Sequence, residues 1–464
     1  MDRLGVILLA AGQGTRMKSD LPKVLHSLGG KPLFLHVLDT AQKLRPEKIA
    51  VVIGHRAEAV KRACARDGVA WVVQERQLGT GQAVLCAKEA FDGFAGDVLI
   101  LSGDVPLIGE KTLRAMIERH QSRSAALTLL TANLDEPRGY GRILRDPRGK
   151  LVGIVEEKDA SDAQRDLREV NAGVYVAAAP FLFGALKQIK NHNRQGEYYL
   201  PDIVTVGLRQ GKTIETLAAE DARETMGVNT REELAFMEEN LRRKINQKWM
   251  LAGVTLKDPE TTYIDEGVTI GRDTVIGPNT QLRGKTVIGK RCQIDGSAFL
   301  TDAEIGDEVH LKFSVVMTGC RVQRGAIVGP FAHLRPGTDL GPEVHIGNFV
   351  EAKEAQIGER TKANHLTYLG DVSIGKDSNI GAGTITCNYD GFHKYKTRIG
   401  DRVQVGSDTT LVAPITLGDD VYVATASTLR RDVPAGALAY NRREERVREG
   451  WTEEKRKKMA GSKK

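Results

Sequence analysis

The segment from Leu9 to Lys23 combines glycines with the basic residues Arg16 and Lys23 at a spacing suited to phosphate binding. It begins Leu9-Ala10-Ala11-Gly12-Gln13-Gly14-Thr15-Arg16-Met17, and Lys23 follows a short loop later. Glycines at the end of a strand let backbone N–H groups approach a phosphate, and Arg16 adds a fixed positive charge. No Gly-Lys-Ser/Thr follows, so this is not a Walker loop. Met17 stands where a dinucleotide fingerprint needs its third glycine.

Two further loops carry groups suited to a metal ion and to a nucleobase. Asp104 lies in Ser102-Gly103-Asp104, directly after the strand-like run Val98–Leu101, and its carboxylate is a hard oxygen ligand suited to Mg²⁺. The same aspartate could instead cap the next helix. Gln74, followed by the tight Gly79-Thr80 turn, offers an amide that can pair with the edge of a base.

A third group lies far along the chain. Arg335 and Lys353 are separated by three hexapeptides, and Lys353 and His365 by two. In a coil of three hexapeptides, Arg335 and Lys353 share one corner of successive coils and form a clamp for a phosphate. Two interpretations of His365 compete with a chemical role: a buried, hydrogen-bonded histidine, and a zinc ligand shared with His333 and His345. Zinc is disfavoured because His333 stands beside the cationic Arg335.

Alternating strand and helix patterns must position the first two groups. The apolar run Leu4–Ala11 predicts a strand that is buried on both faces. Strand patterns at 49–53, 70–73 and 98–101 alternate with helix patterns at 57–65 and 81–89. This order predicts βαβ units, a mixed but mostly parallel sheet, and a site at the carboxyl ends of its strands. We expect this Rossmann-like α/β domain to span residues 1–231.

A repeat with a period of six must position the third group. An aliphatic residue followed by glycine recurs from 264 to 429, as in Ile270-Gly271 and Ile276-Gly277. Three six-residue strands per coil predict a left-handed parallel β-helix with stacked aliphatic residues inside. Glycine is expected at corners that need an unusual backbone conformation. The register is less regular between 288 and 328, where the residues expected to point inward are Cys292, Ile294, Phe299, Ile305 and Val309.

A helix is expected to join the two domains. Thr230 and Glu233 have the spacing of a capping box, and Leu234, Met237, Leu241 and Ile245 fall on one helix face. We expect residues 232–252 to form an amphipathic linker helix that connects the two domains, and residues 253–464 to form the β-helix domain. The last ten residues of its basic tail are expected to be solvated and frayed.

The bulk composition limits the class of protein. The chain has 464 residues, 41% hydrophobic and 27% charged, which predicts two or three globular domains. The net charge is +7, but no base-reading fold is visible, so nucleic acid is not expected as a partner. The five cysteines lack metal spacing and predict buried free thiols of a reducing compartment. Without a signal peptide or a membrane-spanning run, we expect a cytoplasmic protein.

The first domain resembles the sugar-phosphate nucleotidylyltransferases, on Leu9–Met17 together with Leu21-Pro22-Lys23-Val24-Leu25. The resemblance implies a phosphate contact for Lys23, uracil contacts for Gln74, Gly79 and Thr80, and Mg²⁺ binding by Asp104 and Asn229. Glu156, rather than its neighbour Glu157, would hold the sugar. The implied nucleotide- and sugar-binding residues are Leu9, Ala10, Ala11, Gly12, Arg16, Lys23, Gln74, Gly79, Thr80, Gly103, Asp104, Gly141, Glu156, Asn171 and Asn229.

The second domain closely resembles the bacterial bifunctional glucosamine-1-phosphate N-acetyltransferase and N-acetylglucosamine-1-phosphate uridylyltransferase. The similar stretches are 331–337, 348–353, 362–371, 379–384 and 387–391. The resemblance implies that His365 is the general base for attack of the sugar amine on the acetyl thioester, and that the Ala382 N–H steadies the oxyanion. Arg335 and Lys353 would hold the sugar phosphate, while Tyr368 and Asn379 would orient the sugar. The implied acetyl-CoA contacts are Ala382, Asn388, Tyr389, Ser407, Thr425 (where an alanine is usual) and Arg442.

Both halves imply one pair of consecutive reactions. Acetyl-CoA would acetylate glucosamine 1-phosphate, and UTP would then uridylylate the product with Mg²⁺, giving UDP-N-acetylglucosamine for peptidoglycan and lipopolysaccharide precursors. Solenoids of this fold usually trimerise, which implies a homotrimer. One alternative is a nucleotidylyltransferase for another sugar, such as an ADP-glucose pyrophosphorylase with a regulatory solenoid. Another is a scaffold subunit without activity. His365 and Tyr368 argue against the first alternative, and Lys23 and Asp104 against the second.

Overall fold

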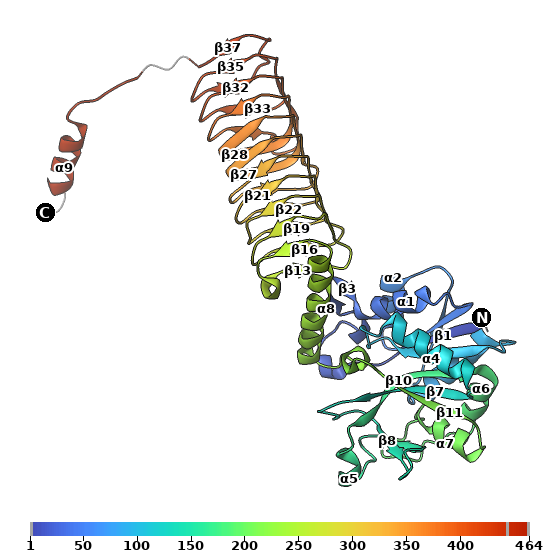
Figure 1. Ribbon diagram of the computed structural model, residues 1–464. Helices are drawn as coiled ribbons and strands as arrows, with labels where there is room; N and C mark the ends of the chain where they lie inside the picture. Colours follow the sequence, from blue (N-terminus) through green and yellow to red (C-terminus); the bar gives the residue numbers. More distant parts are fainter. Residues whose placement is uncertain (1–2, 442–444, 462–464) are drawn as a thin grey trace. The chain divides into compact units, whose positions relative to one another are not determined.

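The computed structural model describes residues 3–441 and 445–461 (Figure 1). The chain divides into two compact units, residues 1–244 and 245–464. The division falls within one long helix, α8 (Arg231–Leu251), at the place where the sequence predicts a linker helix. Each unit has its own core.

The first unit is built on a mixed sheet with the strand order β11-β7-β10-β6-β1-β4-β5 (Figure 1). β1, β4, β5 and β6 run parallel, whereas β10 runs antiparallel to both β6 and β7. The pair β8–β9 is attached to β10, and β2 and β3 form a small separate hairpin. The strands are β1 (Leu4–Ala10), β2 (Ser27–Leu28), β3 (Lys31–Pro32), β4 (Lys48–Ile53), β5 (Val69–Val73), β6 (Asp97–Ser102), β7 (Leu127–Asn133), β8 (Arg142–Arg145), β9 (Leu151–Val155), β10 (Glu169–Ala178) and β11 (Ile214–Ala218).

Helices cover both faces of this sheet. Side chains alternate along β1, so Val6 and Leu8 pack with α1, α2 and α4, while Ile7 packs with α3, α6 and α7. The first strand is therefore buried on both faces, as its apolar run predicts. The helices are α1 (Leu33–Lys43), α2 (Ala57–Cys64), α3 (Thr80–Cys86), α4 (Glu110–Ser122), α5 (Asp162–Arg165), α6 (Ala179–Leu186) and α7 (Asp202–Arg209), with the 3-10 turns η1 (Thr15–Met17), η2 (Lys23–Leu25), η3 (Ala87–Phe91) and η4 (Ala222–Thr225).

The linker helix α8 begins with the predicted capping box. The Glu233 N–H donates to the Thr230 hydroxyl at 3.1 Å, and the Thr230 N–H donates to the Glu233 carboxylate at 3.0 Å. Along the predicted apolar face, Met237, Leu241 and Ile245 are buried and Leu234 is half-buried.

The second unit is a left-handed parallel β-helix, as the repeat predicts (Figure 1). Successive coils pair in parallel, and Leu282, Leu300, Met317 and Leu334 stack in its buried interior. β27 and β28 each continue through three faces of the prism. The strands and the short η5 (Pro259–Thr261) are β12 (Thr255–Leu256), β13 (Tyr263–Ile264), β14 (Thr269–Ile270), β15 (Val275–Ile276), β16 (Gln281–Arg283), β17 (Val287–Ile288), β18 (Gln293–Ile294), β19 (Phe299–Thr301), β20 (Glu304–Ile305), β21 (His310–Leu311), β22 (Val316–Thr318), β23 (Arg321–Val322), β24 (Ile327–Val328), β25 (His333–Leu334), β26 (Asp339–Leu340), β27 (His345–Ile357), β28 (Lys362–Ile374), β29 (Asn379–Ile380), β30 (Ile385–Cys387), β31 (Thr397–Ile399), β32 (Gln404–Val405), β33 (Thr410–Val412), β34 (Ile415–Leu417), β35 (Tyr422–Val423), β36 (Thr428–Leu429) and β37 (Leu438–Ala439).

The repeated glycines serve a different purpose from the predicted one. A Cβ at Gly271 would lie 2.6 Å from the backbone of Gly289, and one at Gly277 would overlap the Asp295 carbonyl oxygen. The left-handed backbone falls two residues later, on residues such as Asp273 (φ 63°) and Asn279 (φ 55°). These glycines are therefore needed because the next coil passes too close for a side chain.

The irregular region reflects a change in coil length. Leu282 pairs with Leu300, three full hexapeptides further on, but Ile288 pairs with Ile305, which falls one residue short of that spacing. Cys292, Ile294, Ile305 and Val309 are buried as predicted. The prediction for Phe299 was wrong: this side chain is 41% exposed and its neighbour Leu300 is fully buried. Neighbouring residues of a strand point to opposite faces, so an error of one residue reverses the assignment.

The tail also differs from its prediction. Residues Trp451–Gly461 form a helix, α9, where a frayed terminus was expected. Glu, Lys and Arg are good helix formers, and the Lys455 ammonium lies 4.8 Å from the centre of the Trp451 ring one turn away. None of the helices in the described ranges is both long enough and apolar enough to cross a membrane.

Candidate active sites

A hollow of about 650 Å³ lies at the carboxyl ends of β1 and β6. Its walls come from segments far apart in the sequence, which meet because parallel strands end at the same edge of the sheet. Eleven predicted residues line it: Leu9, Ala10, Ala11, Gly12, Arg16, Lys23, Gln74, Gly79, Thr80, Asp104 and Asn229. Gly103 lies behind this wall, where its N–H donates to the Leu9 carbonyl at 2.8 Å.

The loop after β1 packs tightly against Lys23. Gly14 has a φ of +64°, and a Cβ there would lie 2.6 Å from the Lys23 Cβ. Only glycine combines this backbone conformation with so close an approach. Arg16 lies on η1 and Lys23 opens η2, so two short turns hold both cations beside the hollow.

One ammonium group joins Asp104 to Asn229. Lys23 Nζ donates to the Asp104 carboxylate and, at 3.1 Å, to the Asn229 side-chain oxygen. The Val228 N–H donates to the Asp104 carbonyl at 2.9 Å, which fixes these two distant segments side by side. A carboxylate and an amide oxygen thus face one cationic atom. This donor set fits Mg²⁺, which protein sites often hold through one or two such oxygens.

The predicted base-binding loop is locked by the segment at 195–200. The Gln74 amide donates to the Gly79 carbonyl at 3.1 Å and to Gln82, and the Thr80 hydroxyl accepts from the Leu200 N–H at 3.0 Å. A Cβ at Gly79 would lie 2.6 Å from the Tyr198 carbonyl oxygen. Both bonds use the Gln74 side-chain NH2 group, so its side-chain oxygen remains as an acceptor without a hydrogen-bond partner among the described residues.

Nine residues of this wall were not among the predicted site residues. Seven of them lie within or next to the predicted motifs: Gln13, Gly14, Thr15, Val24, Gln77, Ala83 and Ser102. Gln195 and Glu197 come from a separate segment. The neighbouring Tyr198 pairs with the base-binding loop, since its carbonyl accepts from the Gly81 N–H at 2.8 Å and its N–H donates to the Leu78 carbonyl at 2.8 Å. The stretch has neither a strand nor a helix period, so its sequence carries no specific signal.

The three residues predicted for the sugar lie close together but outside the lining of the hollow: Gly141 directly precedes β8, Glu156 directly follows β9, and Asn171 lies on β10. The Asn171 N–H donates to the Gly141 carbonyl at 2.8 Å, and the Glu156 carboxylate lies 3.1 Å from the position of a Gly141 Cβ. The Asn171 side chain donates to the Tyr175 hydroxyl at 2.7 Å and accepts from the Gly173 N–H at 3.2 Å.

Glu156 and Glu157 lie in different environments. Glu157 forms an ion pair at 2.8 Å with Arg142, which is almost fully buried. Burial, followed by the nearby carboxylates of Asp202 and Asp159, raises the pKa of Glu156 to about 7. Since Glu157 is bound to a structural partner, Glu156 is the carboxyl group that can receive a ligand.

Cations gather at one corner of the β-helix. His333 pairs with Glu351 across successive coils, so Arg335 stands level with Lys353, as their spacing of three hexapeptides predicts. Glu351 forms an ion pair with Arg335 at 2.8 Å, and Tyr368 stands one coil on from Glu351. The Lys394 ammonium, then the Arg335 guanidinium, lowers the pKa of Lys353. Three clustered cations favour an anion.

His365 lies exposed at another corner of the prism. Its Nδ1 is 3.0 Å from the Asn348 side-chain oxygen. Because that oxygen can only accept, Nδ1 carries the proton and Nε2 is left as a base. Ala382 stands one coil on at the same corner. Its N–H donates to no acceptor within the described ranges. The exposure excludes the buried, hydrogen-bonded histidine considered above.

The residues predicted to contact acetyl-CoA occupy two corners. Ala382, Ser407 and Thr425 follow one another at the corner of His365: the Asp408 N–H donates to the Ala382 carbonyl at 2.7 Å, and the Ala426 N–H to the Ser407 carbonyl at 2.8 Å. Asn388 donates to the Asp371 carboxylate at the cationic corner, and Tyr389 is exposed nearby. Arg442 lies outside the described residues.

Asn379 is set apart from the other residues predicted for the sugar. It lies on β29 in line with Lys362, whereas Tyr368 lies past the intervening corner, in line with Glu351. Within one chain, therefore, the two side chains project from different faces of the prism.

Sequence reasoning missed Asn348, Glu351, Asp371 and Lys394 at these corners. A signal for Lys394 exists. Ile374 pairs with Ile399, well beyond the usual spacing of three hexapeptides, so this coil holds an insertion that carries Lys394. Insertions in solenoids form loops and often belong to the binding face.

A zinc site has no support within residues 3–441 and 445–461, where no group of three or more His, Cys, Asp or Glu side chains could hold a metal ion. The three histidines considered for zinc are dispersed: His345 and His333 lie on different faces and His365 at a corner.

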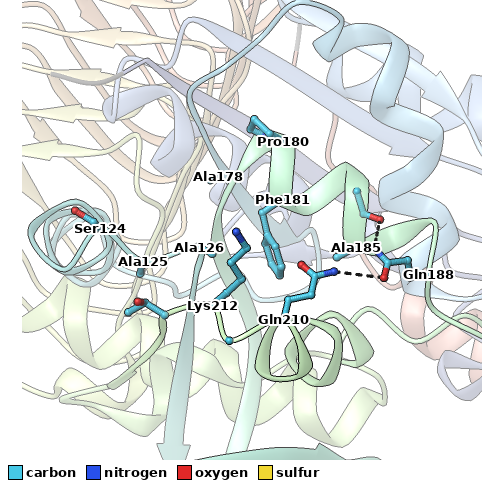
Figure 2. A pocket seen from close by; sticks show the side chains of 13 residues that line it. Ser124, Ala125, Ala126, Ala178, Pro180, Phe181, Ala185, Gln188, Gln210 and Lys212 are labelled. Carbon is cyan, nitrogen blue, oxygen red and sulfur yellow. Dashed lines mark hydrogen bonds between the residues drawn. The ribbon is translucent and has the colours of Figure 1, made fainter.

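A second hollow in the first unit, of about 620 Å³, lies between the loop before β7, helix α6 and the loop before β11. Figure 2 shows Lys212 beside the Phe181 ring, and Gln210 donating to Gln188 at 3.3 Å. Lys212 is the one charged residue in its described lining, which holds no carboxylate, histidine or thiol. This hollow offers no group for metal or acid–base chemistry.

Comparison with known proteins defines the class. Residues 6–195 match the MobA-like NTP transferase domain, and residues 259–329 match the GMPPB C-terminal domain. With the fold above, the chain is a nucleotidyltransferase unit joined to a left-handed β-helix unit.

Relatives along the whole chain define the family. The bifunctional protein GlmU of Pelobacter propionicus is 49% identical over 99% of this chain and all of its own length. Those of Geotalea uraniireducens and Shouchella clausii are 48% and 46% identical, over 97% and 94% of this chain and 99% and 96% of their own lengths. The chain belongs to the GlmU family, which confirms the predicted resemblance over nearly its whole length.

Proposed function

We propose that the two units divide two consecutive transfers on one aminosugar phosphate. The second unit acetylates glucosamine 1-phosphate with acetyl-CoA, and the first unit transfers a uridylyl group from UTP to the product. UDP-N-acetylglucosamine and pyrophosphate result. The observation that carries this proposal is the presence in one chain of a cation-lined hollow at a sheet edge and of a β-helix that has an exposed, oriented imidazole at one corner and a cluster of cations at another.

In the acetyl transfer, His365 is the base. Nε2 takes a proton from the sugar's neutral 2-amine as the nitrogen attacks the thioester carbonyl, and the Ala382 N–H donates to the developing oxyanion. The C–S bond then breaks, and the sulfur leaves as the coenzyme thiol with that proton. The Asn348 oxygen at 3.0 Å from Nδ1 holds the imidazole in the required tautomer.

The cationic corner binds the sugar phosphate. Arg335 and Lys353 supply the predicted clamp, and Lys394 adds a third charge that lowers the pKa of Lys353 until an anion arrives. Tyr368 and Asn379 orient the sugar. Acetyl-CoA contacts Ala382, Asn388, Tyr389, Ser407 and Thr425. Arg442, outside the described residues, remains in the proposal through the resemblance alone.

In the uridylyl transfer, the chain positions two polyanions. Lys23 and Arg16 face the triphosphate, and an oxygen of the sugar phosphate attacks the α-phosphorus in line as pyrophosphate leaves. Mg²⁺, held by Asp104 and Asn229, neutralises phosphate charge when bound. The free Gln74 oxygen accepts the N–H of uracil, with Gly79 and Thr80 at the ring edge. Glu156 and Asn171 accept and donate hydrogen bonds to the sugar.

We further propose that the chain assembles as a homotrimer through the β-helix. Phe313, Phe331 and Phe349 form an exposed ladder along the corner of His365, with ring centres 6.0 and 5.4 Å apart, and Leu366 continues it. An exposed apolar ridge favours burial by another chain. Since Tyr368 and Asn379 project from different faces, a neighbouring chain would complete the acetyl-transfer site. The free cysteines and the substrates fit the cytoplasm.

One experiment tests the division of labour. Both products are measured by mass spectrometry for wild type, His365→Ala and the control His310→Ala, whose imidazole contacts Asp295 on an earlier coil. We expect His365→Ala to lose acetyl transfer at least a hundredfold while uridylyl transfer stays within twofold. A wild type that uridylylates but never acetylates glucosamine 1-phosphate would instead support a regulatory solenoid.

A further inference from the structure

The first turn of α8 contacts the residues that surround the nucleotide hollow. Besides closing the capping box with Thr230, the Glu233 carboxylate accepts the N–H of Asn229 at 2.5 Å. An ordinary capping box satisfies the N-cap residue alone. Here the same carboxylate also holds the residue before it, whose side-chain oxygen faces Lys23.

The segment that leads to Asn229 is fixed at every residue. The Gly227 N–H donates to the Tyr140 hydroxyl at 3.3 Å, and the Val228 N–H donates to the Asp104 carbonyl at 2.9 Å. Glu233 supplies the third bond, to Asn229 itself. Two of the three bonds come from the sheet side of the segment, and the third comes from the helix. Without Glu233, the backbone of Asn229 loses its anchor on the helix side.

A second side chain of the same turn contacts the loops that carry the cations. Arg231 Nε donates to the Met17 carbonyl at 3.4 Å, at the end of the turn that holds Arg16. Its Nη1 donates to His26 Nδ1 at 3.2 Å, directly after the turn that Lys23 opens. One helical turn therefore contacts both cation-bearing loops and the asparagine.

We propose that Glu233 is a positioning residue for the uridylyl transfer, which sets the side-chain oxygen of Asn229 for the divalent cation. The start of the linker helix is thus part of this active site, where the sequence indicated an amphipathic connector. The inference rests on the proposed function of the hollow and on the fit of Asp104 and Asn229 to a divalent cation.

The test compares Glu233→Ala with Glu233→Gln and the matched control Glu232→Ala. Glu232 is exposed on the same turn and has no hydrogen bond or ion pair within the described residues, so its removal reproduces the change in helix-end charge alone. Gln keeps an oxygen that can accept both N–H groups. Two quantities are measured on the full chain: Mn²⁺ binding by electron paramagnetic resonance in the presence of UDP-N-acetylglucosamine, and the Mg²⁺ concentration for half-maximal uridylyl transfer.

We expect Glu233→Ala to weaken Mn²⁺ binding and raise the Mg²⁺ requirement about tenfold, as losing a group that orients a metal ligand commonly does. Glu233→Gln is expected within threefold of wild type and Glu232→Ala within twofold, with acetyl transfer unchanged in all three. Unchanged Mn²⁺ binding in Glu233→Ala, or equal losses in Glu232→Ala, overturns the proposal.

Two further results keep the outcomes distinct. If Glu233→Ala lowers the folded fraction, Glu233→Asp replaces it: the shorter side chain keeps the negative charge at the start of the helix but draws back the one oxygen that accepts both N–H groups. A loss of Mn²⁺ affinity is then expected, and wild-type affinity refutes the proposal. If wild type itself lacks uridylyl transfer, the proposed function of the hollow fails, whatever the variants do.

Discussion

Replacement of Glu156 by glutamine is expected to stabilise the first unit at high pH. Glu156 is partly buried beside Asp202 and Asp159, and burial is the larger cause that raises its pKa from 4.5 to about 7. Between these two values the folded chain keeps a proton that the unfolded chain has lost. The free energy of unfolding therefore falls as the pH rises between these two pKa values, and it stays at the lower value at higher pH.

The magnitude follows from these two pKa values. Loss of the Glu156 proton lowers the free energy of unfolding by about 3 kcal/mol at pH 8.5 and by about 1 kcal/mol at pH 5.5. Each pH unit between the two pKa values contributes about 1.4 kcal/mol. Glutamine cannot ionise, so its advantage over glutamate should grow by about 2 kcal/mol from pH 5.5 to pH 8.5. This is an upper limit, because water reaches part of the carboxyl group.

Hydrogen exchange provides the assay. Peptides from β10, which lies between β6 and β7, report opening of the first unit and give its free energy at both pH values. Glu157→Gln is the matched control: it breaks the ion pair with the buried Arg142 and should destabilise the unit. An equal gain from Glu156→Gln at both pH values, or a loss at pH 8.5, would refute the reasoning. The same variant should raise the KM for the sugar phosphate, because a carboxylate acceptor is lost.

Three other predictions concern the β-helix. Lys394→Ala should raise the KM for glucosamine 1-phosphate about tenfold with kcat within twofold, whereas Lys396→Ala, an exposed lysine of the same insertion, should change neither; equal effects would contradict the cationic cluster. Asn348→Ala should lower kcat of acetyl transfer about tenfold or more, because His365 loses the acceptor of its Nδ1 proton. Asn348→Asp should restore most of the lost kcat. Steady-state kinetics measure both variants, and full kcat in the alanine variant would refute the role of Asn348. Leu300→Ala should cost about 2–5 kcal/mol in urea unfolding of the β-helix, and Phe299→Ala, next to it but exposed, less than about 1 kcal/mol; the reverse order would mean that the register is misassigned.

Sequence patterns predicted the elements of both units because those patterns follow directly from local geometry. The apolar run at Leu4–Ala11 requires a strand covered on both faces, and β1 has Val6 and Ile7 in opposite cores. A period of six has no helical solution, so it fixed the β-helix, and the capping box at Thr230 marked the start of α8. The motif glycines and cations indicated where phosphates would bind.

The roles of several single residues at the two sites could not be predicted from the sequence. Gln195, Glu197 and Lys394 belong to segments without a period, and folding brings them beside residues over a hundred or several tens of positions away. Glu156 and Glu157 are identical in chemistry and adjacent in sequence. Their difference arises from Arg142 on the neighbouring strand, which pairs with one of them.

The sequence by itself determined that this chain holds an α/β unit and a coiled prism, since the side-chain period of each element is a local property of the backbone. The tertiary structure alone decided which atoms face one another. The repeated glycines are required by the distance to the next coil, Leu300 rather than Phe299 points inward and stacks on Leu282 of the preceding coil, and Glu233 reaches Asn229 across the start of α8. Such contacts depend on how separate segments are aligned, and a shift of one residue reverses them.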